Sequence, residues 1–207
     1  MLIDLESSIK KYGIKVNGVI HIGAHYGQEF NTYKNLGIDN IVFFEPIPET
    51  FKILKNNVGD KAILHETALG NSVGEIDMNV ETVNHGQSSS ILTPYLHLQQ
   101  YPSIVFNKKV KVSINKLDNF LNYSKNHNFI VIDVQGYELE VFKGSEEYLK
   151  YVDGIITEVN RDEVYKDCTK INELDEFLLK YSFKRVETNW VGGIWGDALY
   201  VNQKFIK

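Results

Sequence analysis

The chain has 207 residues, and its 22 basic and 27 acidic side chains give a formal net charge of -5. That length fits one domain of ordinary size, and a hydrophobic share of 43% with 12% aromatic residues excludes intrinsic disorder as the main state. The net acidity argues against a nucleic-acid-binding protein, which carries a basic footprint, and no apolar run approaches the roughly 20 residues that span a bilayer.

The first seventy residues alternate between helical and extended patterns. Apolar residues at helical spacing predict a helix over residues 2–12, within an N-terminal segment 1–15, that ends at Gly13. There follow a predicted strand over 16–22, a helix over 26–37, a strand over 40–45, a helix that starts at Pro48 and a third strand over 62–69. The unbroken apolar run at 41–44 is typical of a strand buried on both faces of a parallel sheet.

Residues 71–116 break this rhythm. Alternating polar and apolar residues predict strands over 75–81 and 110–114, with a polar loop at 84–90 between them. We interpret the segment as a small β insertion in a single domain that spans residues 1–207. Helical order resumes after the insertion, with Asn115 as the predicted N-cap residue.

The rest of the chain returns to alternating strands and helices. The predicted elements are a strand over 129–134, a helix from Glu138, a strand over 153–159, a helix over 171–178, and a closing hairpin of 183–188 and 197–201 that turns at Gly192 and Gly193. Strands separated by helices imply βαβ units. The sequence therefore predicts an α/β protein with a mostly parallel sheet and antiparallel strands at one edge.

Ligands of such sheets bind outside the carboxyl ends of the strands. After the first strand, Gly23 and Gly27 allow the backbone to approach a ligand closely at a helix N-terminus, although a tight turn without a ligand has the same pattern. Glu45 ends the second strand 22 positions after Gly23, near the spacing at which an acid binds ribose hydroxyls. The alternative for Glu45 is a solvated carboxylate at a strand end.

Later residues add candidates for chemistry. Asp133 follows four apolar residues, so it is predicted beside the same site, either as a reactive group or as a cap of the next helix. His85, in the polar loop, is either a general base or an exposed loop histidine. Glu138 and Glu158 are either solvated ends of their elements or, with Asp133, ligands of a divalent metal. Nothing in the spacing demands a metal, so we predict none.

Six segments carry a further signal when they are taken together. They are His21-Ile22-Gly23-Ala24-His25-Tyr26-Gly27, Phe44-Glu45-Pro46-Ile47-Pro48, Ala68-Leu69-Gly70, Ser88-Ser89-Ser90, Ile132-Asp133-Val134-Gln135-Gly136-Tyr137-Glu138 and Asp197-Ala198-Leu199-Tyr200-Val201. In this order they resemble the motifs of the FkbM-type S-adenosylmethionine-dependent methyltransferases, over most of residues 16–202. The chain departs from the family pattern at His21, His25 and Gln135, which replace an acid, an Asn and a Glu.

The resemblance implies a class I methyltransferase fold, which is Rossmann-like, with a seven-stranded, mostly parallel sheet, an antiparallel closing hairpin and helices on both faces. It implies S-adenosyl-L-methionine as the cofactor. The residues implied to contact that cofactor are His21, Gly23, Ala24 and Gly27 around its methionine part, Glu45 and Pro46 at its ribose, and Ala68 and Leu69 at its adenine.

The family mostly methylates oxygen on small molecules, so the resemblance implies O-methyl transfer to a sugar, a glycan or another small molecule. A hydroxyl acceptor must lose its proton, for which Asp133 is the first candidate base and His85 the second. Residues 71–116 are rich in Asn, Gln, Ser, His and Tyr, and we predict that they form the acceptor side of the site. The alternative is that this insertion only covers an edge of the sheet.

Two other functions stay open. A catalytically silent binding module on the same fold is favoured by His21, and a nicotinamide oxidoreductase is opposed by the missing G-x-G-x-x-G turn. The single cysteine, Cys168, and the absence of a basic-then-apolar leader predict a cytoplasmic protein. We expect no nucleic-acid partner and no membrane insertion.

Overall fold

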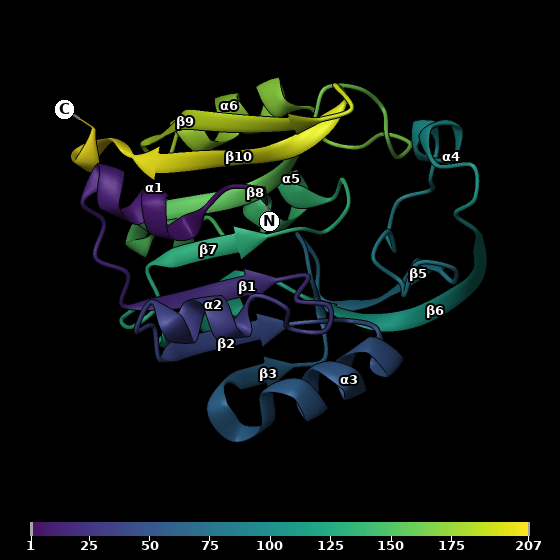
Figure 1. The fold of residues 1–207 in the computed structure, drawn as a ribbon, viewed down its shortest axis with the longest axis horizontal. Coiled ribbons are helices and arrows are strands. Elements are labelled where there is room, and N and C mark those ends of the chain that lie inside the picture. The colour runs from purple at the N-terminus through teal and green to yellow at the C-terminus, as the bar shows by residue number, and fades with distance from the viewer. Residues whose placement is uncertain (1, 207) are drawn as a thin grey trace.

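A seven-stranded sheet forms the centre of the computed structural model, which describes residues 2–206 (Figure 1). In spatial order its strands are β3 (Ile63–His65), β2 (Asn40–Phe44), β1 (Gly18–Ile22), β7 (Phe129–Ile132), β8 (Gly154–Asn160), β10 (Trp195–Asn202) and β9 (Phe183–Val191). The first five are parallel, and β10 is antiparallel to both β8 and β9. The predicted sheet and closing hairpin are therefore confirmed.

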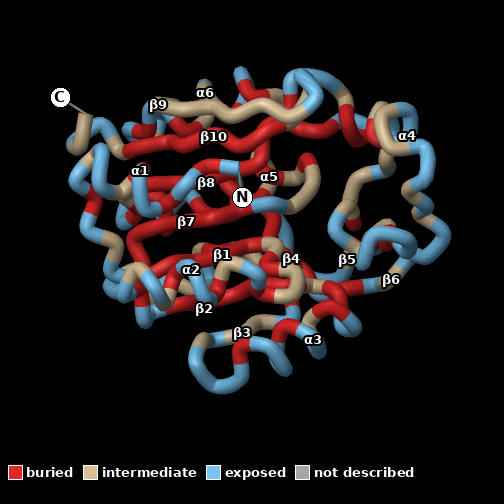
Figure 2. The backbone as a smooth tube through the Cα atoms, viewed as in Figure 1, coloured by how far each residue is buried: buried red, intermediate tan, exposed pale blue. Residues whose placement is uncertain are grey.

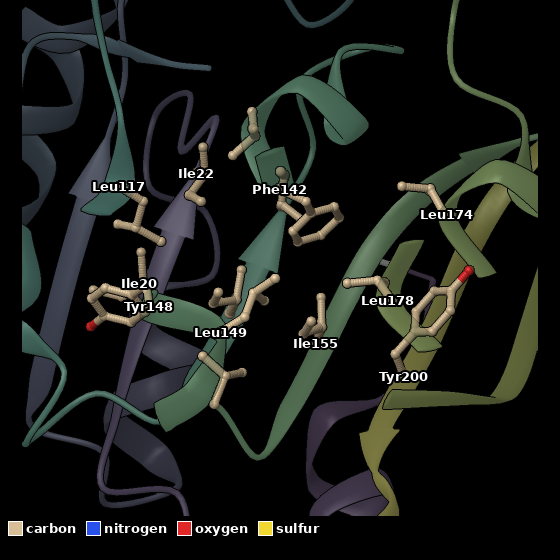
Figure 3. Packing of buried hydrophobic residues seen from close by; sticks show 14 of the residues in the cluster. Ile20, Ile22, Leu117, Phe142, Tyr148, Leu149, Ile155, Leu174, Leu178 and Tyr200 are labelled. Atoms are coloured by element: carbon tan, nitrogen blue, oxygen red, sulfur yellow. The ribbon is translucent and has the colours of Figure 1, made fainter. Parts of the chain in front are cut away.

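Helices cover both faces of this sheet, as predicted. The helices on one face are α1 (Leu5–Tyr12), α2 (Phe30–Asn35) and α3 (Pro48–Val58), and those on the other are the 3₁₀ helix η2 (Leu117–Tyr123), α5 (Glu138–Lys143), the 3₁₀ helix η3 (Tyr148–Tyr151) and α6 (Ile171–Leu179). Two further short 3₁₀ helices are η1 (Gly59–Lys61) and η4 (Gln203–Phe205). The central strands are buried almost throughout (Figure 2). Figure 3 shows the second face, where Phe142, Leu174 and Leu178 pack toward Ile155 and Tyr200.

Two predicted helices begin later than the sequence suggested. Helix α1 begins at Leu5, because the Asp4 carboxylate accepts a hydrogen bond from the Ser7 backbone N–H (2.8 Å) and caps the helix there. It ends at Gly13, as predicted, with the left-handed backbone angle typical of a C-cap glycine. Helix α2 begins at Phe30 and not at residue 26, since residues 23–29 form an extended turn.

The predicted third strand over 62–69 was wrong. The chain forms two short strands there, and only β3 joins the large sheet. The second, β4 (Ala68–Leu69), pairs in parallel with β6 (Phe106–Asn115) in a separate three-stranded sheet whose other strand is β5 (Gly74–Glu81). The predicted N-cap Asn115 was also wrong, because Asn115 is the last residue of β6 and η2 begins two residues later.

The insertion at 71–116 is the small β structure that the alternation predicted, with one helix that it did not, α4 (Leu96–Gln100). Figure 1 shows it extending from the carboxyl edge of the large sheet on the side of β2 and curving back toward the top of β8 and β10. Backbone hydrogen bonds from Tyr95 and His97 to the Val164 carbonyl (3.1 and 3.0 Å) attach α4 to the segment after β8. The insertion therefore arches over one end of the sheet.

The strand register brings three loops to one edge of the sheet. Ile22 pairs with both Phe44 and Ile132, so the next residues, Gly23, Glu45 and Asp133, leave the sheet side by side. The contact between two of these turns is close enough to require glycine. Gly23 has a φ of 78°, and a Cβ placed on it would lie 1.9 Å from the Asp133 carbonyl oxygen.

We therefore expect Gly23→Ala to lower the free energy of unfolding by at least about 3 kcal/mol, because it combines left-handed strain with an overlap against backbone. Gly37→Ala is the matched control, since Gly37 has a φ of 74° and no atom within 4 Å of the place that a Cβ would take. That control should cost about 1 kcal/mol. Urea unfolding measures both, and equal losses would contradict the close contact.

Candidate functional site

A cavity of about 270 Å³ lies at the carboxyl edge of the large sheet, between the sheet and the insertion. Of the residues predicted to contact a cofactor, those that line it are His21, Gly23, Ala24, Glu45, Pro46, Ala68 and Leu69, and the predicted base Asp133 lines it too. Gly27 does not line the cavity, because it packs against Leu54 of α3. His85 does not line it either, although its neighbours Gly86 and Gln87 do.

Glu45 is a buried residue with 4% exposure, which excludes the alternative of a solvated strand-end acid. Its two carboxylate oxygens accept hydrogen bonds from the backbone N–H groups of His25 and Ile47, each at 2.9 Å. Burial raises the pKa of Glu45 to about 7, and those two hydrogen bonds oppose the rise. Each oxygen keeps a further lone pair, so the carboxylate can still accept from hydroxyls in the cavity.

His25 connects this turn to the insertion. Its Nε2 lies 2.8 Å from the His85 carbonyl oxygen and its Nδ1 lies 2.8 Å from Gln28 Nε2, so the ring donates from Nε2 and accepts at Nδ1. The ring stacks on Tyr26, whose hydroxyl donates to the same carbonyl (3.3 Å). The His85 side chain itself is exposed, so what this position contributes is its main chain.

The loop that follows is shaped by another buried carboxylate. Glu81 accepts hydrogen bonds from the backbone N–H groups of Val83, Asn84 and Gly86, the last at 2.8 Å. Ser89 Oγ accepts from the Glu81 backbone N–H at 3.0 Å. Gly86, Gln87 and Ser89 of this loop line the cavity.

His21 stands on the α2 face of β1. Its Nδ1 lies 2.8 Å from the Tyr33 hydroxyl, and its ring packs against Phe43 with the ring centres 5.5 Å apart. Burial lowers the pKa of His21 to about 4, although the Glu29 charge opposes the shift. The imidazole is therefore neutral near pH 7 and adds no positive charge to the cavity.

Asp133 is exposed to the cavity at the end of β7 and is joined to a second carboxylate. Gln135 Nε2 donates to Asp133 Oδ1 and to Glu158 Oε2, each at 2.7 Å. The pKa of Asp133 is raised to about 6, first by desolvation and then by the Asp197 charge, while the Gln135 bond opposes the rise. Because Asp133 is exposed, solvent screens part of that effect.

Glu138 and Glu158 are buried, which corrects the interpretation of both as solvated ends. Glu138 Oε1 accepts from the backbone N–H groups of Val134 and Gly136, at 3.2 and 3.1 Å, and fixes the loop after β7. Burial raises the pKa of Glu138 to about 7. Tyr137, and not Asp133, occupies the N-cap position of α5, so Asp133 is not a helix cap.

This geometry can be compared with known proteins. The sequence pattern of the methyltransferase FkbM domain matches residues 21–185. The chain belongs to the FkbM methyltransferase family. The 2-O-methyltransferase NoeI of Sinorhizobium fredii (strain NBRC 101917 / NGR234) is 28% identical over 196 residues, which are 90% of this chain and 79% of NoeI.

Solved structures agree on the fold of this FkbM-family chain. The magnesium protoporphyrin IX methyltransferase of Synechocystis PCC 6803, with bound SAM, has a TM-score of 0.53 at 9% identity and covers 95% of this chain and 77% of its own. A SAM dependent methyltransferase from Aquifex aeolicus has a TM-score of 0.50 at 12% identity, with 97% and 90% covered. At these identities the likeness shows a Rossmann-like methyltransferase fold.

Two carboxylates of this FkbM-family site were missed by the sequence analysis. Asp197 lines the cavity from β10, directly across from Glu158 in the strand register, and accepts from the Leu2 backbone N–H at 2.5 Å. Glu29 lines it from the residue before α2. An acid in front of the otherwise apolar stretch 198–201 was a usable signal for Asp197, whereas nothing local in the sequence distinguished Glu29.

The charged residues that line the cavity are acidic. Its acidic residues are Glu29, Glu45, Asp133, Glu158 and Asp197, and no Lys or Arg among the described residues lines it. Within residues 2–206, no group of three or more His, Cys, Asp or Glu side chains is arranged to hold a metal ion. No helix in the same range is long and apolar enough to cross a membrane.

The burial of Glu45 predicts a pH dependence of stability. Its pKa is about 7 in the folded chain and 4.5 as the ordinary value, so unfolding releases a proton between these two limits. The stabilising contribution is therefore complete below about pH 4.5 and is lost as pH rises through 7, by an amount on the order of 2–3 kcal/mol.

Urea unfolding at pH 5 and pH 8 measures this loss. Glu45→Gln cannot ionise, so its free energy of unfolding should fall less over the same interval than that of the wild type, whatever its offset at pH 5. Parallel slopes for the two proteins would show that Glu45 titrates normally.

Proposed function

We propose that this methyltransferase transfers a methyl group from S-adenosyl-L-methionine to a hydroxyl of a sugar, a glycan or another small molecule. The observation that carries the proposal is Asp133, a carboxylate open to the cavity beside the turn of Gly23 and Glu45. A base next to the cofactor turn is what a hydroxyl acceptor requires, since its proton must leave during methyl transfer.

The residues of the cavity fit the cofactor. S-adenosylmethionine, when bound, supplies an electrophilic methyl group on a cationic sulfur, and a wall of carboxylates, with no Lys or Arg from residues 2–206, matches that charge. Gly23, Ala24 and His21 would hold the methionine part, and Glu45, beside Pro46, the ribose. Ala68 and Leu69, both buried, offer an apolar edge to the adenine.

Asp133 has the properties of the general base. A pKa of about 6 leaves it largely ionised at neutral pH but still basic enough to accept a proton from a hydroxyl in the transition state. The bond to Gln135 fixes one carboxylate oxygen and leaves the other for the acceptor. His85 is less suited to this role, because its side chain lies outside the cavity lining.

The insertion supports a polar, uncharged acceptor. Gln87 and Ser89 line the cavity from the loop at 84–90, together with the apolar Met78 and Ile91. Amide and hydroxyl groups can pair with sugar hydroxyls, and the apolar side chains can pack on the faces of a sugar ring. The relative NoeI is a 2-O-methyltransferase, which also favours oxygen as the methylated atom.

The alternative, a catalytically silent binding module, is favoured by His21 in place of the family's acid. A neutral His21 weakens that argument, because it does not repel a cationic ligand. The alternative predicts cofactor binding without turnover on any acceptor.

We expect Asp133→Asn to keep the affinity for S-adenosylhomocysteine within a few-fold and to lower turnover by roughly 10²–10⁴, the usual contribution of general acid–base catalysis. Asn preserves shape and can still accept from Gln135 Nε2. His85→Ala is the control and should keep most of its activity. Full activity of Asp133→Asn together with loss in His85→Ala would exchange the two roles.

The acceptor class is tested by a methyl-transfer screen over oligosaccharides, nucleotide sugars, catechols, tRNA and peptides. We expect turnover on a neutral glycan or glycoside, and its loss on deleting residues 84–90 while S-adenosylhomocysteine still binds. Turnover confined to tRNA or peptides would refute the acceptor class. Cofactor binding with no turnover on any class would favour the silent module.

A further inference from the structure

The side-chain amide of Gln135 is hydrogen-bonded on both its atoms. Nε2 donates to Asp133 Oδ1 and Glu158 Oε2, each at 2.7 Å, and Oε1 accepts from the Tyr165 hydroxyl at 2.8 Å. Two carboxyl groups that hold at most one proton between them present mainly acceptor oxygens, so the amide nitrogen faces them. The amide oxygen then faces the Tyr165 hydroxyl, whose single proton lies within reach of both this oxygen and the Ser88 carbonyl, each at 2.8 Å. The two carboxylates are therefore held next to each other by a single nitrogen.

The main chain of Gln135 is held as firmly as its side chain. Its φ is 56°, a left-handed angle that costs about 1 kcal/mol or more in a residue other than glycine and persists only when neighbours fix it. Ser90 Oγ donates to the Gln135 carbonyl at 2.8 Å, and the Gly136 N–H donates to Glu138. Gln135 is therefore fixed in its main chain as well as in its side chain, and its amide stays between the two carboxylates.

The described side chains around this pair supply no positive charge. Glu158 is buried on β8 and lies near Glu138 of α5, Asp197 of β10 and the Tyr165 hydroxyl. Besides burial, the charges of Asp197 and of Glu29, which precedes α2, raise the pKa of Asp133, whereas the charge of the N-terminal amino group lowers it. No Lys or Arg from residues 2–206 lines the cavity, and the nearby His21 is neutral. The neighbouring Asp133 therefore adds to burial in raising the pKa of Glu158, which Gln135 alone opposes only in part.

We propose that Gln135 couples Asp133 and Glu158 into a pair that shares one proton in the free protein, and that binding of the cationic cofactor drives this proton into solvent. The inference rests on the proposed function for the identity of the cofactor. It makes Glu158 a partner of the base and Gln135 a positioning residue.

The consequence is that the pair gives up its shared proton, and both carboxylates are ionised, when the cofactor is bound. One O–H bond of the pair breaks and its proton passes to water or buffer. The positive charge of the sulfonium then offsets the negative charge of the two carboxylates in place of the proton. Asp133 is then ionised when the acceptor arrives and can receive the proton of its hydroxyl. S-adenosylhomocysteine has no sulfonium charge, so it should leave more of the proton in place. The pKa of Glu158, raised by burial and by Asp133, has the direction that this exchange requires.

Calorimetric titration at pH 6.5 in two buffers of different ionisation enthalpy counts the protons released on binding, with no acceptor present. We expect S-adenosylmethionine to release about half a proton or more beyond the number released by S-adenosylhomocysteine. Comparison of the two ligands cancels any proton lost by Glu45, whose surroundings they share.

Substitutions identify the groups that hold the released proton. Glu158→Gln keeps an acceptor for Gln135 Nε2 but removes the second titrating group, so the difference between the two ligands should shrink to about 0.1 proton. Gln135→Met removes the bridge and should shift the difference measurably, since nothing then ties the two carboxylates. The surface variant Glu75→Gln is the control and should leave the difference unchanged.

Two failures can be told apart. Equal proton release for the two ligands, or a difference that survives in Glu158→Gln, would overturn the shared proton while the cofactor assignment stands. If neither ligand binds the wild type, both the inference and the proposed function are wrong.

Discussion

Carboxylates gathered at one edge of the sheet impose the main constraint on this molecule. They lie where strands β1, β2, β7, β8 and β10 meet the cavity. Backbone N–H groups donate to Glu45, and the Gln135 amide donates to Asp133 and Glu158. Glu45 accepts hydrogen bonds from backbone N–H groups of two loops, and Glu138 accepts from two N–H groups of a single loop. Asp197 accepts from the backbone N–H of Leu2. Since an unpaired buried carboxylate costs several kcal/mol, each loop must adopt the one path that delivers its donors.

The same bonds give the loops their shape. Glu45 joins the turn after β1 to the start of α3 through two hydrogen bonds. Glu81 accepts from backbone N–H groups of the insertion loop and so fixes its path. His25, in the turn after β1, contacts this loop at the His85 carbonyl. A carboxylate that organises a loop in this way stays close to the cavity and keeps lone pairs for a ligand. Structure and recognition therefore depend on the same groups, and raised pKa values among them are the expected cost of a site built for a cation.

Local patterns were enough to predict the central strands, the closing hairpin and the edge at which the site lies. A buried run such as 41–44, or the glycine turn at Gly23, can be recognised from a few consecutive residues. The break between β3 and β4 was missed because the pairing of β4 with β6 joins segments 46 residues apart, as in Ala68 with Ile114. The burial of Glu45 was missed for a related reason, since the insertion that covers it is a tertiary neighbour.

Two of the three departures from the family pattern, His21 and Gln135, each replace an acidic residue. Where the FkbM motifs have an acid at the end of the first strand and a Glu after Asp133, this chain has a neutral histidine and an amide. Each replacement removes one negative charge from a wall that already carries five acidic residues. An acid at position 135 would also repel Asp133 and Glu158, whereas the amide donates to both. The chain thus keeps a cavity attractive to a cation while it lowers the cost of holding that cavity empty, and the amide turns two repelling carboxylates into neighbours.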